Sequence, residues 1–213
     1  GEYAEMPLWD ARETTTLRNN RWRCDHGWDI DLDDGSTNYH IYNNLCLNGG
    51  IKNREGFYRV VENNIMVNNS FHPHVWYRNS HDVFRRNIVF GPYRPVRMPR
   101  PWGKEIDYNL LHVPGLADAR PAGELQQLTG RDVHSVAADA MFIDPENGDY
   151  RVREGSPALE LGFENFPMDR FGVESARLRA IARTAELPER VISATGGDAG
   201  RAPEAIDSAH VQR

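Results

Sequence analysis

One sequence feature limits the possible folds of this chain more than any other: asparagines recur at a nearly constant spacing. The last Asn of each group is Asn20, Asn44, Asn64, Asn87 and Asn109, at steps of 24, 20, 23 and 22 residues. After the first group, each Asn leads directly into a short apolar segment. A fixed period of about 20–50 residues is typical of repeat architectures, in which each repeat is one structural unit.

This repeat favours a right-handed parallel β-helix over a helical solenoid. No sustained 3.6-residue apolar period occurs between residues 20 and 113, and short strands between turn residues suit stacked coils of about 20–25 residues. Asn suits a corner because it tolerates the left-handed conformation and because its amide can bond to the Asn above and below. We therefore expect an all-β, pectate-lyase-like β-helix. A β-sandwich with Asn-rich turns is the competing interpretation.

Composition and the N-terminal sequence narrow the possible classes of protein. The net charge is −6, from 25 basic and 31 acidic side chains, whereas a general nucleic-acid binder needs a basic face. No apolar run approaches the about 18 residues of a membrane span, and the N-terminus does not resemble a signal peptide.

The chain begins with Gly1 and shows no obvious cap before Asn19. We expect part of a longer protein, or a protomer of a homo-oligomer capped by its neighbour; the compartment stays open.

The periodic part of the chain is followed by segments of different character. We expect residues 1–173 to form the coils and their closing segment. Residues 174–213 are predicted to form a helical and then disordered tail, because Ala, Arg, Leu and Glu dominate its first part. Four prolines predict a loop at residues 91–104, and residues 114–135 form a polar excursion with a short helix near 124–128. Because an open coil exposes unpaired strand edges, we expect the C-terminal segment to cap the stack.

The cysteines are too few for a disulfide scaffold. The chain has two, Cys24 and Cys46. We expect both to be small buried apolar residues, although their spacing would place them one coil apart if a bridge formed.

A second set of strands is predicted from an alignment of three segments. Residues 30–35 can be laid over residues 51–56, and residues 75–80 then fall beneath both. Side chains alternate between the two faces of a strand, so the first residue of each segment points inward and the second and fourth point outward. The predicted outward columns are Asp31, Lys52 and Trp76, and then Asp33, Arg54 and Arg78, with Asp34, Glu55 and Asn79 at the strand ends. A slip of one residue would exchange the two faces.

Acidic, basic and aromatic residues converge on this predicted face. Alternation places Asp29, Asp31 and Asp33 toward solvent within about 14 Å of strand, and such neighbouring like charges need a cation, a proton or basic partners. The next coil supplies Lys52 and Arg54. The following coil supplies His72, His74, Trp76 and Arg78, and either Trp76 or Trp102 is expected to stack on a sugar.

Three interpretations of this face stay open. In the first, an ionised Asp and a protonated Glu flank a glycosidic bond, because carboxyl groups on adjacent coils can meet the separation of about 5–5.5 Å that a retaining glycosidase uses. In the second, the Asp cluster binds calcium, and Lys52 or Arg54 removes a proton from a uronic acid, as in a polysaccharide lyase. In the third, the face is salt-bridged and does no chemistry. His72 and His74 alone are too few to predict a metal site.

Several segments resemble one known family. They are WDIDLDDGS at residues 28–36, NYHIYNN at 38–44, REGF at 54–57 and FHPHVWY at 71–77. These segments are similar to the β-helix core of glycoside hydrolase family 120, the β-xylosidases. DPENGDY at residues 144–150, with GSPA at 155–158, resembles the closing segment of many carbohydrate-active β-helix proteins.

The resemblance implies a retaining, exo-acting glycosidase on xylo-oligosaccharides or related β-glycosides, without a cofactor. By this match Glu55 is the acid/base, and the nucleophile lies among Asp31, Asp33 and Asp34; we favour Asp33, which is predicted to face outward near Arg54. The expected pocket residues are Lys52, Arg54, His72, His74, Trp76, Arg78 and Trp102. A polysaccharide lyase and a non-catalytic carbohydrate-binding β-helix are the alternatives, with calcium expected only for the lyase. The expected partner is an oligosaccharide or polysaccharide, not nucleic acid or a membrane.

Overall fold

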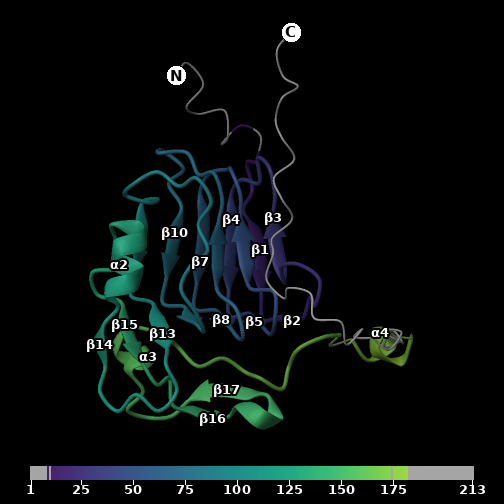
Figure 1. Ribbon diagram of the computed structural model, residues 1–213. Coiled ribbons are helices and arrows are strands. Elements are labelled where there is room, and N and C mark those ends of the chain that lie inside the picture. Colours follow the sequence, from purple (N-terminus) through teal and green to yellow (C-terminus); the bar gives the residue numbers. More distant parts are fainter. Residues whose placement is uncertain (1–8, 10, 174, 182–213) are drawn as a thin grey trace, which may run out of the picture. The chain divides into compact units, whose positions relative to one another are not determined.

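The computed structural model of the chain describes residues 9, 11–173 and 175–181. Within residues 11–173 the chain forms a parallel β-solenoid of about six turns, drawn in Figure 1, and its last part packs against these coils. The predicted parallel β-helix is therefore confirmed, and the β-sandwich interpretation is wrong, because the strands of successive coils pair in parallel.

The coils build three parallel sheets, which we call sheets A, B and C. Sheet A contains, in spatial order, β1 (Thr15–Arg18), β4 (Tyr39–Tyr42), β7 (Arg59–Glu62), β10 (Val83–Arg85) and β12 (Glu105–Asp107). The parallel strands of sheet B are β2 (Arg21–Trp22), β5 (Leu45–Cys46), β8 (Ile65–Met66), β11 (Ile88–Val89), β13 (Leu110–His112) and β15 (Val136–Ala138), and β14 (Arg120–Pro121) joins β15 antiparallel. Sheet C contains β3 (Ile30–Leu32), β6 (Ile51–Asn53) and β9 (Phe71–Pro73).

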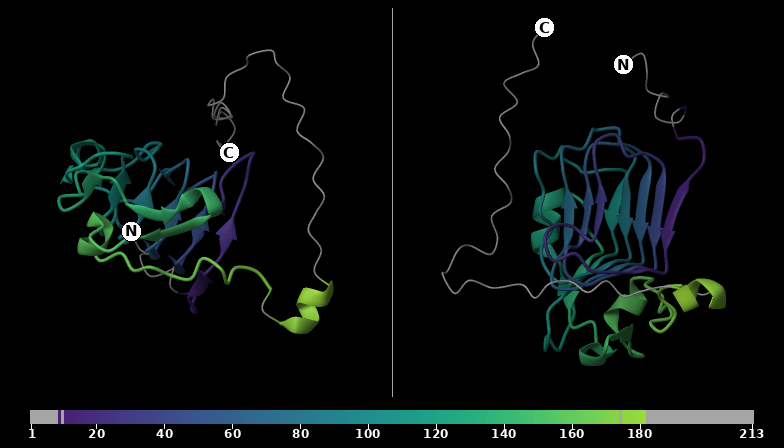
Figure 2. Two further views of the ribbon diagram at one scale, coloured as in Figure 1. Left: turned by 90° about the horizontal axis from the view of Figure 1, so that it is seen from below. Right: turned by 90° about the vertical axis from the view of Figure 1, so that its right-hand side faces the viewer.

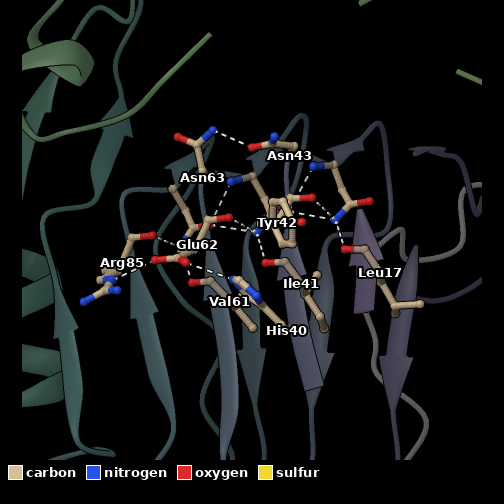
Figure 3. A network of polar contacts seen from close by, with 12 residues as sticks. Leu17, His40, Ile41, Tyr42, Asn43, Val61, Glu62, Asn63 and Arg85 are labelled. Carbon is tan, nitrogen blue, oxygen red and sulfur yellow. Dashed lines mark hydrogen bonds and ion pairs between the residues drawn. The ribbon is translucent and has the colours of Figure 1, made fainter. Parts of the chain in front are cut away.

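The asparagine repeat is a buried amide ladder between sheets A and B. The Asn44 side chain donates from Nδ2 to Asn64 Oδ1 at 3.0 Å and to the carbonyl oxygens of Leu17 and Tyr42 at 2.9 and 3.0 Å. The same amide-to-amide bond joins Asn20 to Asn44, Asn64 to Asn87 and Asn87 to Asn109. Figure 3 shows part of this network beside the ends of the sheet A strands. The predicted stacking of Asn on Asn is confirmed.

The two residues of each asparagine group have different tasks. The second residue belongs to the buried ladder, whereas the first has a left-handed backbone, with φ of 54°, 53° and 54° at Asn19, Asn43 and Asn63. Arg86 and Tyr108 hold the equivalent positions in later coils at φ 54° and 57°. The doublet can therefore lose its first Asn, as it does at Arg86, while the ladder continues.

Apolar side chains from all three sheets fill the interior of the solenoid. In sheet A the inward column contains Ile41, Val61, Phe84 and Ile106. The Phe71 ring from sheet C stacks on Phe84 with centroids 4.0 Å apart. Cys46 is buried here and Cys24 is half-buried; both are free thiols, so no bridge joins them.

Sheet B also buries its outward face. Leu45, Ile65, Ile88 and Leu110 point away from the interior, yet each is at most 1% exposed, because residues 142–171 pack over them. This covering segment contains β16 (Phe142–Asp144), η1 (Pro145–Asn147), β17 (Asp149–Val152) and α3 (Pro157–Glu160), followed by Phe163 and Phe166. The β16–β17 hairpin lies in front of the solenoid in the left view of Figure 2.

The covering segment runs back along the coils, so that Glu164 exchanges two hydrogen bonds with Asn63, at 2.8 and 2.7 Å. The predicted cap from the C-terminal tail falls mostly outside the described residues. The helix α2 (Gly123–Thr129) covers the last coils, with Ala122 and Leu125 buried against the interior. This helix confirms the one predicted near residues 124–128.

The chain after residue 174 forms a separate unit, of which residues 175–181 are described. It contains α4 (Ala176–Ile181), in agreement with the predicted helical composition. The disorder predicted at the end of the tail lies outside the described residues. Among the described residues, no helix is long and apolar enough to cross a membrane.

Candidate active site on sheet C

Sheet C brings the predicted charged residues together, in a register that differs in one strand. Asp31 pairs with Lys52, as predicted, but Lys52 then pairs with His72. The alignment of residues 75–80 with this sheet was wrong by four positions, because the step from Ile51 to its partner Phe71 is as short as the 20-residue step between Asn44 and Asn64. His72 and His74 therefore occupy the places predicted for Trp76 and Arg78.

Lys52 is the centre of the first half of the site. Its Nζ lies 2.9 Å from Asp31 Oδ1, 3.2 Å from Asp33 Oδ1 and 4.3 Å from the ring centroid of Trp28. The side chain is only 6% exposed, so its charge is held by two carboxylates and an aromatic face with little help from water. Trp28 was not predicted, because it lies before the start of β3, where two-residue alternation does not apply.

Arg54 is the centre of the second half. Its Nε lies 2.7 Å from Asp34 Oδ1 and 2.8 Å from Glu55 Oε2, and its Nη1 lies 3.6 Å from Asp33 Oδ1. Since one nitrogen contacts both oxygens, Asp34 Oδ1 and Glu55 Oε2 lie on the same side of the site and close to each other. Partial burial opposes the charge of Arg54, but Glu55, Asp34 and Asp33 outweigh it and raise the pKa of Arg54.

The carboxyl of Asp33 is held ionised by both basic residues. Partial burial opposes its charge, but the hydrogen bond and charge of Lys52, together with the charge of Arg54, outweigh burial and lower the pKa of Asp33. The Asp33 side chain remains 63% exposed, so the charged oxygen is accessible to a ligand.

Burial opposes a positive charge on both histidines of this site. Burial is the main cause that lowers the pKa of His72 to about 3, and burial with the nearby charges of Lys52 and Arg54 also lowers the pKa of His74. His72 Nε2 lies 2.8 Å from Asn69 Oδ1, and both imidazoles meet Trp28 edge to face at 6.0 and 5.9 Å. Among the described residues, no group of three or more His, Cys, Asp or Glu side chains is arranged to hold a metal ion.

A buried ion pair supports the backbone beneath this site. The fully buried side chains of Arg59 and Asp82 form two hydrogen bonds with each other, at 3.0 and 2.5 Å. Arg59 also donates from Nη1 to the carbonyl oxygen of Arg54. Burial raises the pKa of Asp82, against the opposing charge of Arg59. The sequence gives no signal for this pair, because the two residues lie 23 positions apart on different coils.

Four predicted side chains lie elsewhere. The expectation that Asp29 faces solvent was wrong: its Oδ2 accepts hydrogen bonds from the backbone N–H groups of residues 48, 49 and 50, at 3.0, 2.8 and 3.1 Å. Trp76 and Trp102 are 4% and 1% exposed in the core, so neither can stack on a sugar. Trp76 instead donates from Nε1 to the Asn53 carbonyl oxygen at 2.9 Å. Arg78 is exposed, beyond the end of β9.

Comparisons of this chain with protein-family models, with curated proteins and with solved structures each find no match. The resemblance to glycoside hydrolase family 120 therefore stays a prediction. The chemistry open to sheet C is set by the geometry of its charged side chains, which are Asp31, Asp33, Asp34, Lys52, Arg54 and Glu55.

Proposed function

We propose that this chain is a glycoside hydrolase that acts with retention of configuration, with Glu55 as acid/base and Asp33 as nucleophile. The observation that supports this proposal is the convergence of Asp33, Asp34 and Glu55 on the guanidinium of Arg54. A retaining mechanism needs one carboxylate held ionised and a second carboxyl group close to it. Lys52 and Arg54 supply the first condition at Asp33 by lowering its pKa.

The reaction proceeds in two displacements. Once Arg54 has moved away and Glu55 has taken up a proton from solvent, Glu55 donates this proton to the glycosidic oxygen while Asp33 attacks the anomeric carbon. The leaving alcohol departs and a glycosyl ester forms on Asp33. Glu55, now ionised, removes a proton from water, and the water oxygen attacks the anomeric carbon and releases Asp33. Trp28, beside Lys52, offers an aromatic face for a sugar ring, and His74 offers a neutral hydrogen-bonding group.

Arg54 separates the carboxyl groups and must move when a substrate enters. Its guanidinium contacts both Asp33, through Nη1, and Glu55, through Nε, so it blocks the approach of a glycosidic bond to this pair. Arg54 is 39% exposed at its side chain, so displacement toward solvent meets little packing resistance. Asp34 is the second candidate nucleophile, because it shares the Arg54 Nε with Glu55, whereas Asp33 contacts Nη1.

The substrate class in this proposal is a β-linked xylo-oligosaccharide or related glycoside. The support is the resemblance of residues 28–77 to β-xylosidases, together with the exposed carboxylates on sheet C.

The test is hydrolysis of an aryl β-xyloside by the wild type and by Glu55→Gln, Asp33→Asn and Asp34→Asn. We expect Glu55→Gln and Asp33→Asn each to lower kcat/KM by at least about 10³-fold, because each removes one partner of the two-step reaction. Glu124→Gln, an exposed carboxylate on α2, is the matched control and should keep the wild-type rate. Azide rescue of Asp33→Asn, with an inverted product, would identify the nucleophile. Full activity in both site variants would contradict the proposal.

Carbohydrate binding without turnover is the second candidate. The bridging position of Arg54 favours it, since a guanidinium that stays between the carboxylates neutralises them. Binding that persists in Glu55→Gln and Asp33→Asn, with no hydrolysis by the wild type, would favour this candidate. The lyase is less well supported, because the raised pKa of Arg54 makes it a poor base and Lys52 is ion-paired with Asp31 and Asp33.

A further inference from the structure

The outward column of sheet B changes character at its first coil. Successive positions in the register are Arg21, Leu45, Ile65, Ile88 and Leu110. The four aliphatic side chains are buried under the covering segment, whereas Arg21 places a guanidinium at the same outward position. The first coil therefore carries an exposed, charged side chain where the later coils carry buried aliphatic ones.

Arg21 lines a hollow of about 600 Å³ between the first coil and the covering segment. Its other walls are residues 147–149, Arg151 and residues 165–170. A volume of this size lies within the usual range of about 300–1,000 Å³ for small-ligand sites. The hollow is distinct from the charged face of sheet C, since none of its lining residues belongs to that sheet.

Glycine at position 148 allows the guanidinium of Arg21 to approach the backbone. A Cβ built on Gly148 would lie 3.3 Å from Nη2 and 3.4 Å from Nη1 of Arg21, and the Gly148 φ of +86° is strained for other residues. The backbone at Gly148, between η1 and β17, therefore leaves room for the guanidinium of Arg21, although the two residues are more than a hundred positions apart in the sequence.

The three arginines that line the hollow differ in their ionic partners. Arg151 binds Asp149 through hydrogen bonds of 2.9 and 2.6 Å, which lowers the pKa of Asp149. Among the described residues, no carboxylate lies within ion-pair distance of Arg21 or Arg170. Asp169 also lines the hollow, and its charge, after that of Asp149, helps to raise the pKa of Arg151. Arg21 and Arg170 therefore leave two guanidinium groups on the walls of the hollow, and guanidinium groups bind oxyanions.

We propose that this hollow binds the anionic group of a small ligand, the carboxylate of an acidic sugar or a phosphate, through Arg21 and Arg170. Phe166 and Met168 supply apolar wall for the rest of the ligand. The proposal does not depend on the proposed hydrolase activity, because the two sites share no residue.

The experiment is isothermal titration of the wild type with glucuronate, inorganic phosphate and glucose. We expect saturable binding of at least one anion that weakens with added salt, and none of glucose. Binding of glucuronate alone identifies an acidic sugar, and binding of phosphate identifies a phosphorylated ligand; both support the site. The proposal is overturned if neither glucuronate nor inorganic phosphate binds saturably.

The variants test which residues bind the anion. Arg21→Leu gives the first coil the side chain that the next coil has, so it should fold, and it should weaken anion binding at least about tenfold. Arg170→Gln should also weaken anion binding, and this variant alone decides the question if Arg21→Leu does not fold.

Arg120→Leu is the control, because it replaces an exposed arginine outside the hollow, and it should bind the anion as the wild type does. Glu55→Gln should also bind normally, so failure of the hydrolase proposal and failure of this one give different results. Unchanged affinity in both Arg21→Leu and Arg170→Gln would overturn the assignment.

Discussion

Sheets B and C belong to the same coils, yet their outward faces differ completely. Sheet B presents Leu45, Ile65, Ile88 and Leu110 outward and is covered by residues 142–171. Sheet C presents Asp31, Asp33, Lys52 and Arg54 and leaves the acidic members exposed. Two-residue alternation sends both sets outward, so the chemistry of the outward residue decides whether a face becomes a packing surface or a site.

The two faces also contribute differently to stability. Burial of aliphatic side chains stabilises a fold by about 1.5–3 kcal/mol each, so the outward column of sheet B acts as a second core. The ion pairs of Asp33 and Asp34 are more than half exposed at the carboxylates, and exposed pairs contribute little. The exposed carboxylates Asp33 and Asp34 can therefore be changed with little loss of stability, whereas the buried Lys52 cannot.

The largest effect is expected from breaking the covered face. Ile65→Ala should lower the free energy of unfolding by about 2–5 kcal/mol, because Ile65 is fully buried between sheet B and the covering segment. Asp33→Asn, the matched change on sheet C, should alter it by no more than about 0.5 kcal/mol. Urea unfolding followed by circular dichroism measures both. Equal losses in the two variants would remove the distinction between the faces.

A pH-dependent effect of intermediate size is expected on sheet C. His72 must stay neutral in the folded chain, since burial lowers its pKa from 6.5 to about 3, while the unfolded chain accepts a proton near pH 6.5. The unfolded state therefore binds more protons between pH 6.5 and about 3, and stability falls as the pH is lowered through this window, by up to about 1.4 kcal/mol per pH unit.

The measurement for His72 compares unfolding of the wild type and of His72→Gln at pH 7.5 and at pH 5. His72→Gln should lose less stability between the two values than the wild type does, since it has no imidazole to protonate. His81→Gln, which replaces an exposed histidine with no carboxylate within ion-pair distance among the described residues, is the control for the loss of an imidazole. The same slope in all three proteins would show that His72 does not limit acid stability.

The difference between the faces also explains how much the sequence could predict. The amide ladder is periodic, and each Asn bonds to the next coil, so its spacing predicted both the fold and the coil length. The charged strands of the first two coils aligned correctly because Ile30 and Ile51 mark the inward positions. The third strand was misplaced because a step of 24 residues was used where the coil has 20.

Residues that act through tertiary contact had no readable signal. The sequence alone does not distinguish a tryptophan in the core from one that stacks on a sugar. Trp76 and Trp102 were therefore predicted to lie at the site although they are buried in the core, and Trp28 was missed. Arg59 and Asp82 form a buried pair only because two coils stack in one register. The covering segment was equally hidden, since its apolar residues could have capped the stack or packed along its side.

The smallest effect is expected at Val75, just beyond β9 at the edge of the charged face. Its φ of 54° is left-handed, which a β-branched side chain adopts with strain of about 1–2 kcal/mol, whereas the corner positions beside sheet B use Asn19, Asn43 and Asn63 for the same conformation. Val75→Asn should raise the free energy of unfolding by about 0.5–1 kcal/mol, because Asn tolerates this region and Val75 is only half-buried. Thermal unfolding measures the gain. Asn63→Val is the reverse test and should destabilise by at least as much, since it also removes the two bonds to Glu164. If Val75→Asn is more stable and hydrolyses the aryl β-xyloside at the wild-type rate, the strained backbone at Val75 has no part in the reaction. If Val75→Asn is more stable but hydrolyses this substrate more slowly, the left-handed backbone at Val75 is needed to position His74.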